Sequence, residues 1–592
     1  MSVADQIKAV TVKAIKELYA VELAENNILV NATKPEFEGD YTVVLFAFVK
    51  QLKRSPDALG NELGNHLIKN HSELFTSFNI IKGFLNLVVA DNYWIGFLQQ
   101  QHNNISYGIK EKNGERVMVE YSSPNTNKPL HLGHLRNNFL GWSIAEILNA
   151  NGYDVVKTCI VNDRGIHICK SMIAWQLFAN GATPQSSNTK GDHFVGDYYV
   201  KFNDEYKKQV EELIATGVSK EDAEKQAPIM KATQQMLLDW EAGKPDVIEL
   251  WKNMNSWVYD GFNTTYKTIG SDFDKIYYES NTYLLGKSIV EKGLEKNVFF
   301  KKEDGSVWID LTADGLDEKV VMRKDGTSVY ITQDIGLAEQ KQNEFNAGQS
   351  IYVVGDEQNY HFKVLKLICE KLGLPSADQI YHLSYGMVEL PTGKMKSREG
   401  TVVDADDLVE EMISISQQKT EELGKVKDFT AGELEELYKT IGLGALKFFL
   451  LRVDPKKKMV FNPEESIDFH GFTGPFVQYT HARIKSILRK LEGVGSKESG
   501  VGSLLPLEKE LIIQLEIFPT IIAEAAAEHD PSKLAIYIFN LAKVFNSFYS
   551  EHSIANAESE EKKQLRLQSA QLTANVIKRG MSLLGIKVPE RM

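Results

Sequence analysis

One strand–loop–helix–strand unit, residues 117–161, constrains the fold of this chain more than any other feature. VMVEYS predicts a buried strand, and LGHLRNNFLGWSIAEILNANG keeps apolar residues at helical spacing, with Asn151 and Gly152 as its C-cap. DVVKTCIVND predicts the next strand, and SVWIDL, SVYITQDIG and SIYVVG read as later ones. Strands that alternate with helices favour an α/β fold with a Rossmann-type, doubly wound parallel sheet.

The rest of the chain divides around this unit. The sequence predicts a small α/β N-terminal domain at residues 1–110 and a second domain, which holds the sheet, at residues 111–404. A polar, helix-rich segment at about 190–300 interrupts the α/β rhythm as an insertion would. From about 405 onward the sequence is almost wholly helical, with a connector at 405–470 and a helical bundle at 471–592.

Composition excludes several classes of protein. The 592 residues carry 67 Lys and Arg against 80 Asp and Glu, so the net charge is −13, which argues against a general nucleic-acid coat protein but leaves room for a local basic groove. Three cysteines match neither a disulfide framework nor a zinc motif, and predict a reducing, cytoplasmic compartment. The N-terminus lacks the apolar core of a signal peptide, and no apolar run is long enough to predict a membrane span.

The loop SSPNTNKPLHLGH, which starts at residue 122, joins the first strand of the unit to its helix. In a parallel sheet, ligands bind at loops in this position. We expect the helix that begins near Gly133 to present unpaired N–H groups and the positive end of its dipole, which suit a polyphosphate. His131 and His134 lie three apart on the first turn, and Lys128 adds a positive charge. A capped helix start with two surface histidines is the alternative, whereas zinc lacks a third ligand nearby.

A second polar stretch, ELPTGKMKSREGTVV at 389–403, lies between two apolar segments, and by itself it is compatible with a solvated loop. Together, HLGH and GKMKSREG resemble the two signature sequences of class I aminoacyl-tRNA synthetases, which hold ATP from opposite sides. Further blocks narrow the resemblance to the arginyl-tRNA synthetase family, including NDRGIHICKSM, GDHFVGDYYV, RKDGTSVYITQDIG, VDPKKKMVFNPEESIDF, GPFVQYTHARIKSILRK and the terminal PERM. They span residues 117–592, and the first 110 residues are similar to that family's extra N-terminal domain.

One position departs from the class I pattern. Ser397 stands where a second lysine is usual, and Lys396 takes the place before it. Many arginine enzymes instead carry a lysine just ahead of the histidine motif, and Lys128 matches that substitute. Glu399 makes the loop less positive than is common in the family.

The resemblance implies an enzyme that joins arginine to its tRNA through an arginyl-adenylate, with ATP as co-substrate, accompanying Mg²⁺ and no resident metal. It assigns catalysis to His131, His134, Lys128 and Lys394. It assigns ATP to the two histidines with Gly133, Gly355, Asp356, Met387, Val388, Lys394 and Lys396. It assigns arginine to Glu120, Ser122, Asn125, Tyr330, Asp334 and Gln358.

The implied partner is tRNA(Arg), with the enzyme a monomer by family habit. Tyr479, Arg483, Tyr549 and Met592 match the family's anticodon positions, although a helix with a buried Tyr and a solvated Arg would give the same spacing. DPKKK at 454–458 and HARIKSILRK at 481–490 are basic in an acidic chain, and lysines beside aromatics suit phosphates and single-stranded bases.

Two other functions remain open from the sequence. The first is an adenylate-forming ligase of the same superfamily that uses no RNA, against which the basic, aromatic C-terminal helices argue. The second is an inactive RNA-binding relative, against which His131, His134, Lys128 and Asp334 argue. Aminoacylation with arginine, ATP and tRNA separates all three.

Overall fold

The computed structural model describes residues 2–327, 329–391, 403–422, 424, 428–491 and 503–592. The N-terminal domain contains α1 (Val3–Tyr19), η1 (Glu25–Asn27), β1 (Val30–Ala32), β2 (Tyr41–Val44), α2 (Phe46–Leu52), α3 (Pro56–Asn70), β3 (Phe75–Ile81), β4 (Phe84–Val89) and α4 (Asp91–Gln101). Its sheet is antiparallel in the order β1-β2-β4-β3. The expected small α/β domain at the N-terminus is therefore confirmed.

The central sheet carries the predicted strand–helix–strand unit. Its elements are β5 (Arg116–Glu120), α5 (Leu132–Ala150), β6 (Asp154–Val161), α6 (Ile166–Phe178), β7 (Lys275–Tyr278), β11 (Gln349–Gly355), η3 (Asp356–Gln358), α15 (Asn359–Lys371), η4 (Ala377–Gln379) and β12 (Ile380–Tyr385). All pairs are parallel in the order β12-β11-β5-β6-β7. Successive strands are added outward from β5 on one side and then from β11 on the other, so the switch point of a doubly wound sheet lies between β5 and β11.

Both faces of this sheet are buried. Val117, Val119, Ile351 and Val353 pack into the large core that includes α5 and the C-terminal helices. Met118 and Tyr352, which alternate with them along the strands, pack into a second core with Val364 and Ile368 of α15. Two buried faces explain why these strands read as nearly continuous apolar runs.

Two groups of elements interrupt the sheet. The first, between β6 and β7, contains α7 (Pro184–Ser187), α8 (Gly191–Ala215), α9 (Lys220–Gln226), α10 (Pro228–Glu241) and α11 (Pro245–Ile269). The second, between β7 and β11, contains α12 (Glu279–Thr282), α13 (Leu285–Glu295), β8 (Phe300–Lys301), β9 (Val307–Ile309), η2 (Thr312–Asp314), β10 (Lys319–Met322) and α14 (Tyr330–Phe345). The range expected for an inserted segment, 190–300, thus includes β7, a strand of the main sheet.

The stretch SVYITQDIG was expected to form a strand, and that expectation was wrong. Its residues from Tyr330 onward begin helix α14. The β-branched residues at its start favoured a strand, but the buried side chains are Thr332, Ile335, Leu337 and Lys341. These residues lie on more than one side of the helix, so α14 is packed against several neighbours, and tertiary burial outweighs the local β propensity.

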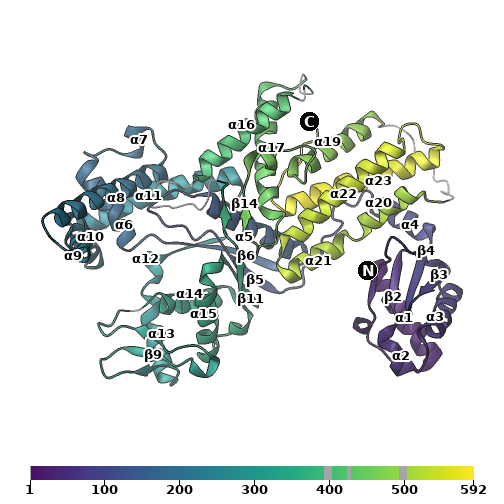
Figure 1. Ribbon diagram of the computed structural model, residues 1–592, viewed down its shortest axis with the longest axis horizontal. Helices are drawn as coiled ribbons and strands as arrows, with labels where there is room; N and C mark the ends of the chain where they lie inside the picture. Colours follow the sequence, from purple (N-terminus) through teal and green to yellow (C-terminus); the bar gives the residue numbers. More distant parts are fainter. Residues whose placement is uncertain (1, 328, 392–402, 423, 425–427, 492–502) are drawn as a thin grey trace.

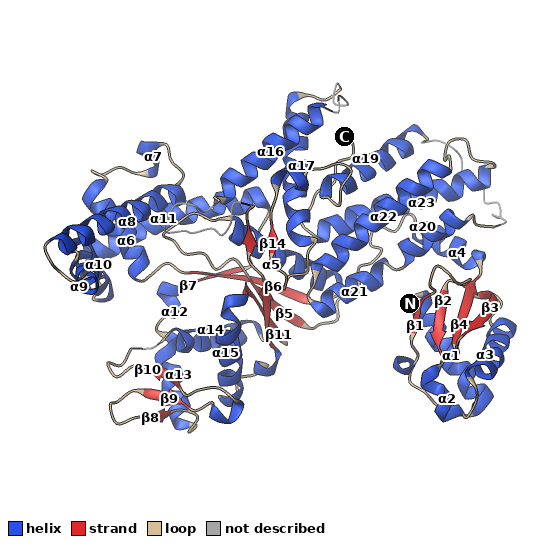
Figure 2. Cartoon of the chain, in the orientation of Figure 1, coloured by secondary structure: helices blue, strands red, loops and turns tan. Residues whose placement is uncertain are grey.

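The C-terminal part is helical as expected. After β13 (Val388–Glu389) it contains α16 (Ala405–Glu422), α17 (Ala431–Leu451), β14 (Met459–Val460), α18 (Pro463–Ser466), α19 (Gly474–Lys490), α20 (Pro506–Glu516), α21 (Phe518–Glu528), α22 (Pro531–Glu551) and α23 (Glu560–Leu583). Figures 1 and 2 show α20, α22 and α23 running from the central sheet toward the N-terminal domain.

The N-terminal domain is attached to the C-terminal helices by polar contacts. The Val3 amide donates to Glu516 Oε1 at 2.7 Å, and Lys509 Nζ lies 2.8 Å from Asp40 Oδ2.

Within the described residues no helix combines the length and apolar character that a membrane span needs. Cys159, Cys169 and Cys369 are buried free thiols.

Candidate functional site

The loop after β5 begins with a strained turn at the carboxyl edge of the sheet. Ser122 and Ser123 have φ angles of 83° and 36°, a region that residues other than glycine rarely occupy. The Ser122 amide donates to Asn137 Oδ1 at 2.6 Å, and its hydroxyl lies 2.6 Å from the Tyr266 hydroxyl. Buried contacts therefore hold the turn, and they already engage the Ser122 side chain.

His131 and His134 form the N-terminal cap of α5. The Gly133 amide donates to His131 Nδ1 at 3.1 Å, and the His131 amide donates to His134 Nδ1 at 3.2 Å. A Cβ on Gly133 would lie 3.0 Å from the His131 ring, so glycine leaves room for that ring. Because each Nδ1 accepts a hydrogen bond, the ring proton of each neutral histidine sits on Nε2.

Burial keeps both histidines neutral. It lowers the pKa of His131 to about 4, with Lys128 adding to the effect, and it lowers the pKa of His134 well below its usual value. The expectation that the helix start presents unpaired N–H groups was wrong for two residues, because the Leu132 amide donates to Val403 O at 3.1 Å and the Gly133 amide donates to His131. Within the described residues, neither Nε2–H group takes part in a hydrogen bond.

The segments that flank the second signature stretch converge on HLGH. The Ala405 amide donates to Leu130 O at 3.0 Å, and Asp404 forms an isolated β-bridge with His131. On the other flank, β13 follows β12 directly at the carboxyl edge of the sheet. Lys394 and Lys396, predicted to contact ATP, lie outside the described residues.

The strand ends beside the switch point carry the other residues predicted for ATP. Gly355 ends β11, and Asp356 begins the 3₁₀ turn that follows. Met387 O accepts from the Met459 amide at 3.2 Å, so this carbonyl is engaged with β14. Peptide groups alternate in direction along a strand, so the backbone N–H and C=O of Val388 point away from β14.

Acidic side chains gather at the same edge of the sheet. Asp334 on α14 has Oδ2 2.7 Å from His361 Nε2, and buried Glu120 at the end of β5 pairs with Lys341. Glu279, directly after β7, lies close enough to Asp334 to interact with it electrostatically. Burial raises the pKa of Glu279 to about 7, Arg164 opposes this, and the Asp163 and Asp334 carboxylates add to it.

The remaining residues predicted for arginine occupy more open positions. Tyr330, at the start of α14, is 73% exposed. Asn125 is exposed and bridges Asn162 after β6, and Gln358 ends the turn that follows β11. All three lie at strand ends or helix starts on the carboxyl side of the sheet.

A charged cluster, formed by Lys190, Asp192, His193, Asp404 and Asp406, joins α8 to the segment after the second signature stretch. His193 Nε2 lies 3.1 Å from Asp404 Oδ2 and 3.3 Å from Asp406 Oδ2. These carboxylates, Asp404 first, raise the pKa of His193 to about 10. Burial opposes ionisation of Asp406, but contacts from His193 and Lys190 lower its pKa to about 2.

The ligand atoms of Asp192, His193 and Asp406 lie within 4.8 Å of one another, as those of a metal site would. The Lys190 ammonium is 3.0 Å from Asp192 Oδ2 and 2.5 Å from Asp406 Oδ2. Because this cation already balances the carboxylates, we assign no ion to the cluster.

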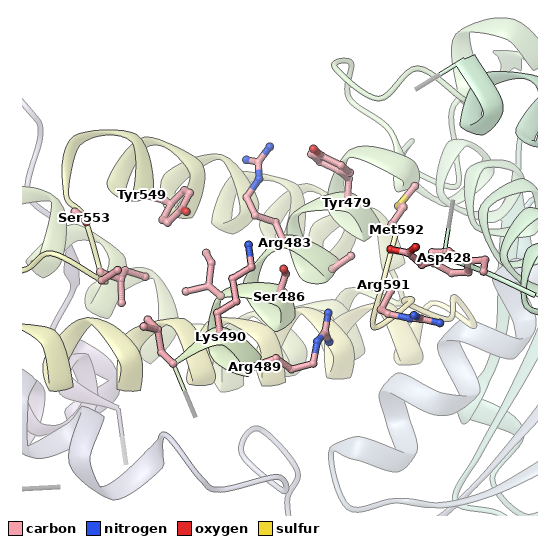
Figure 3. A pocket seen from close by; sticks show the side chains of 16 residues that line it. Asp428, Tyr479, Arg483, Ser486, Arg489, Lys490, Tyr549, Ser553, Arg591 and Met592 are labelled. Carbon is pink, nitrogen blue, oxygen red and sulfur yellow. The ribbon is translucent and has the colours of Figure 1, made fainter. Parts of the chain in front are cut away.

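A cavity of about 620 Å³ opens between α19, α22 and the C-terminal tail. Tyr479, Arg483, Tyr549 and Met592, which the sequence grouped as RNA-contacting, all line it, together with Arg489, Lys490 and Arg591 (Figure 3). The Arg483 guanidinium lies 4.8 Å from the Tyr479 ring centroid, and its Nη1 donates to Asn546 Oδ1 at 2.6 Å. Cations and aromatic rings around one cavity suit a nucleobase and its phosphates.

Comparisons with known families match almost the whole chain. Residues 98–462 match the catalytic domain of class I tRNA synthetases (R), residues 477–592 match the DALR anticodon-binding domain, and residues 5–89 match the arginyl-tRNA synthetase N-terminal domain. A protein of Flavobacterium psychrophilum named arginine–tRNA ligase is 54% identical, with 98% of each chain covered. The chain belongs to the arginyl-tRNA synthetase family.

Other relatives of the family agree with this assignment. An arginine–tRNA ligase of Bacteroides fragilis is 51% identical over the full length of both chains. The structure of Thermus thermophilus arginyl-tRNA synthetase superposes with a TM-score of 0.79 at 25% identity and covers 99% of each chain. Both the family resemblance and the fold class inferred from the sequence are thereby confirmed.

The sequence did not point to several residues of this synthetase fold. Lys341 and His361 pair with predicted acidic residues, and Glu279 interacts electrostatically with Asp334. Glu279 follows the apolar strand KIYY directly, a position at which a carboxylate is a detectable signal for the ligand edge of a sheet. Lys341 and His361 lie within helices and carry no such signal, because only the fold brings them to their partners.

Proposed function

We propose that this chain activates L-arginine and transfers it to tRNA(Arg). An arginine carboxylate oxygen attacks the α-phosphorus of ATP, pyrophosphate leaves, and the arginyl group then passes to the 3′-terminal adenosine with release of AMP. The observation that carries the proposal is the convergence of the two signature segments, in which Leu130 and Leu132 hydrogen-bond residues 403 and 405 at the start of α5. Membership in the family supplies the use of ATP.

His131 and His134 act in this proposal as neutral donors. Their Nε2–H groups make no hydrogen bond to another described residue, and they would stabilise charge that builds on the phosphate oxygens in the transition state. Lys128 is half-buried close to them and would add a positive charge, with Lys394 and Lys396 as the remaining cations. Catalysis then comes from positioning and fixed charges, without a covalent nucleophile.

For the adenosine end of ATP, we assign the backbone of Val388 to the base, because its peptide groups point away from β14. Met387 contributes its 44%-exposed side chain, since its carbonyl is already paired. Gly355 and Asp356, at the end of β11, are assigned to the ribose side. Mg²⁺ would accompany the triphosphate as part of the substrate.

Arginine needs carboxylates that meet a planar, forked guanidinium. Asp334 supports this role because it is partly exposed, and His361 orients its carboxylate from one side. Tyr330 stands one turn earlier on the same helix. Glu120, held by Lys341, is assigned to the amino end of the substrate.

Three further residues complete the proposed amino-acid pocket. Asn125 and Gln358 present amides at neighbouring strand ends. Ser122 is placed in the pocket through its backbone, because its hydroxyl is already engaged with Tyr266. Its positive φ turns the chain away from β5 toward α5.

The cavity between α19, α22 and the C-terminal tail is proposed to hold anticodon nucleotides. Tyr479 and Tyr549 would stack on bases, and Arg483 would contact phosphate or a base edge. Met592, the terminal residue, closes one side of the cavity.

The three buried free thiols agree with a cytoplasmic enzyme, which is the location we propose. That the enzyme is a monomer stays a prediction.

The decisive experiment is aminoacylation by the purified full-length chain with ATP, total tRNA and either arginine or lysine. We expect charging with arginine and little with lysine, because only a guanidinium matches a bidentate carboxylate. Pyrophosphate exchange is measured with tRNA present. Product formed without tRNA supports the RNA-independent ligase, and tRNA binding without turnover supports the inactive relative.

A further inference from the structure

The loop Asp454–Lys458 is basic, like the stretch 481–490 of the proposed anticodon region. It lies, however, at the part of the molecule that is proposed to bind ATP. It connects α17 to β14, and β14 pairs in parallel with β13, the strand that carries Val388. The Phe461 amide, just after β14, donates to Glu389 O at 2.9 Å. The other basic stretch, 481–490, forms α19 and lines the C-terminal cavity. The two stretches therefore serve different parts of the protein.

Two elements of the candidate active site fix the backbone of this loop. Arg136, five residues after His131 on α5 and fully buried, donates from Nη2 to Pro455 O at 3.1 Å and to Lys457 O at 2.9 Å. From the other side, the Gly386 amide donates to Pro455 O at 2.9 Å. The loop is thus held between the HLGH helix and the segment that follows β12.

Gly386 approaches the loop so closely that no side chain fits there. A Cβ at this position would lie 2.7 Å from the carbonyl carbon and oxygen of Lys457 and 2.7 Å from the Lys458 nitrogen. These are backbone atoms, and the Lys457 carbonyl oxygen is itself hydrogen-bonded to Arg136, so they cannot move aside cheaply. The close packing keeps the peptide groups of the loop inward.

With the backbone turned inward, the three side chains Lys456, Lys457 and Lys458 are exposed. They form a compact positive group on a chain whose net charge is −13. The group lies beside β13, next to the edge of the sheet at which the adenylate would form. In the proposed reaction the 3′ end of the tRNA must reach that edge, and it brings a string of phosphates with it.

We propose that Lys456, Lys457 and Lys458 bind the phosphates of the single-stranded 3′ end of the tRNA and guide its terminal adenosine to the adenylate. The proposal rests on the proposed function. Lysines suit this task because phosphate contacts by point charges are independent of sequence and tolerate a moving strand. Arg136 and Gly386 are positioning residues that keep the loop beside the site.

The test uses the full-length chain with Lys456→Gln, Lys457→Gln and Lys458→Gln combined. A matched control replaces three exposed lysines of the inserted helices, Lys207, Lys208 and Lys220, by Gln. Binding is measured at 50 and 200 mM salt for two RNAs: a minihelix with the acceptor stem and 3′ strand, and an anticodon stem-loop. KM values for tRNA, ATP and arginine are measured for the same proteins.

Three phosphate contacts to a single strand contribute about 0.7 each to the salt slope, so a fourfold change in salt alters affinity by about 20-fold through them. We therefore expect the minihelix affinity of the wild type to fall about 20-fold more than that of the triple variant between 50 and 200 mM salt. Anticodon stem-loop binding and the KM for ATP should be unchanged, and replacing the three lysines by Arg should retain the wild-type slope.

Equal behaviour of the triple variant and the control would overturn the proposal. So would a loss of anticodon stem-loop binding, or a raised KM for ATP with minihelix binding intact, which would assign the lysines to the triphosphate. The wild-type chain is assayed first for arginine charging. A wild type that does not charge tRNA refutes the proposed function, whereas a charging wild type with an unaffected triple variant refutes only this inference.

Discussion

The contributions of the two ring nitrogens of His134 can be tested separately, because each nitrogen makes a different contact. Nδ1 accepts a hydrogen bond from the His131 amide, and Nε2–H is the donor proposed to meet the phosphates. In His134→Asn the amide oxygen can replace Nδ1 in the cap, but nothing replaces Nε2–H. In His134→Gln the longer side chain can place an N–H near the position of Nε2. The pair separates catalysis from folding.

The sizes of the two effects follow from these contacts. Loss of one donor to a developing oxyanion costs about 3 kcal/mol, which is roughly a hundredfold in rate. Loss of a helix cap costs about 1 kcal/mol of stability. We therefore expect His134→Asn to lose about a hundredfold in the rate of adenylate formation with nearly unchanged stability. His134→Gln should be roughly tenfold more active than His134→Asn, because a neutral donor recovers about 1.4 kcal/mol.

The assay is tRNA-dependent pyrophosphate exchange at saturating arginine and ATP, with thermal unfolding of each variant as the folding control. The wild-type rate should also show no ionisation from His131 between pH 5.5 and 8, because burial lowers the pKa of that residue to about 4. Protonation would place a proton on Nδ1 and break the bond from the Gly133 amide. Higher activity in His134→Asn than in His134→Gln would refute the donor assignment, as would a His131-dependent inflection near pH 6.5.

Other residues give further predictions. Asp334→Asn should raise the KM for arginine about 10- to 100-fold through loss of a charge-assisted hydrogen bond and leave the KM for ATP unchanged; equal losses would indicate misfolding instead. The pKa of His193 is raised to about 10, so its stabilisation is complete below about pH 6.5 and is lost as pH rises toward 10. Wild type should therefore lose about 2 kcal/mol more stability than His193→Gln between pH 7 and 9 in urea unfolding, and parallel losses would contradict this. Tyr479→Leu should weaken anticodon stem-loop binding about 10- to 100-fold without changing the KM for arginine, and unchanged binding would exclude stacking on this ring.

The local parts of this fold were predictable from the sequence. The apolar spacing of residues 116–161 indicates strands β5 and β6 and helix α5, and the helix ends at Asn151 as expected. The cavity residues Tyr479, Arg483, Tyr549 and Met592 were grouped by family resemblance, and they line one cavity. Such features depend on short-range periodicity or on motifs, both of which a single sequence displays.

Other features depend on long-range packing and were missed. Tyr330 stands in a β-branched run but begins a helix, because the burial of α14 against its neighbours decides its conformation. The Ser122 turn has no glycine to mark it, since Asn137 and Tyr266 stabilise a positive φ from elsewhere in the chain. His361 meets Asp334 only because α15 packs beside α14. Partners of this kind leave no trace in local sequence.

Long-range contacts also hold the two described flanks of the second signature stretch. Its entry strand β13 is held through β14 by the Arg136 contact, and its exit is held by the ion pairs of Asp404 and Asp406 with α8. Arg136 belongs to the helix that His131 caps, so entry strand and histidines share one rigid element. The exit is held at the start of α5 as well, through the backbone hydrogen bonds of Val403 and Ala405 with Leu132 and Leu130, and the ion pairs with the inserted helices add to these bonds. Deprotonation of His193 at high pH would remove only its own ion pairs to Asp404 and Asp406, because the backbone bonds to α5 and the pair between Lys190 and Asp406 do not depend on that proton, so we expect the exit to remain attached to the histidine cap.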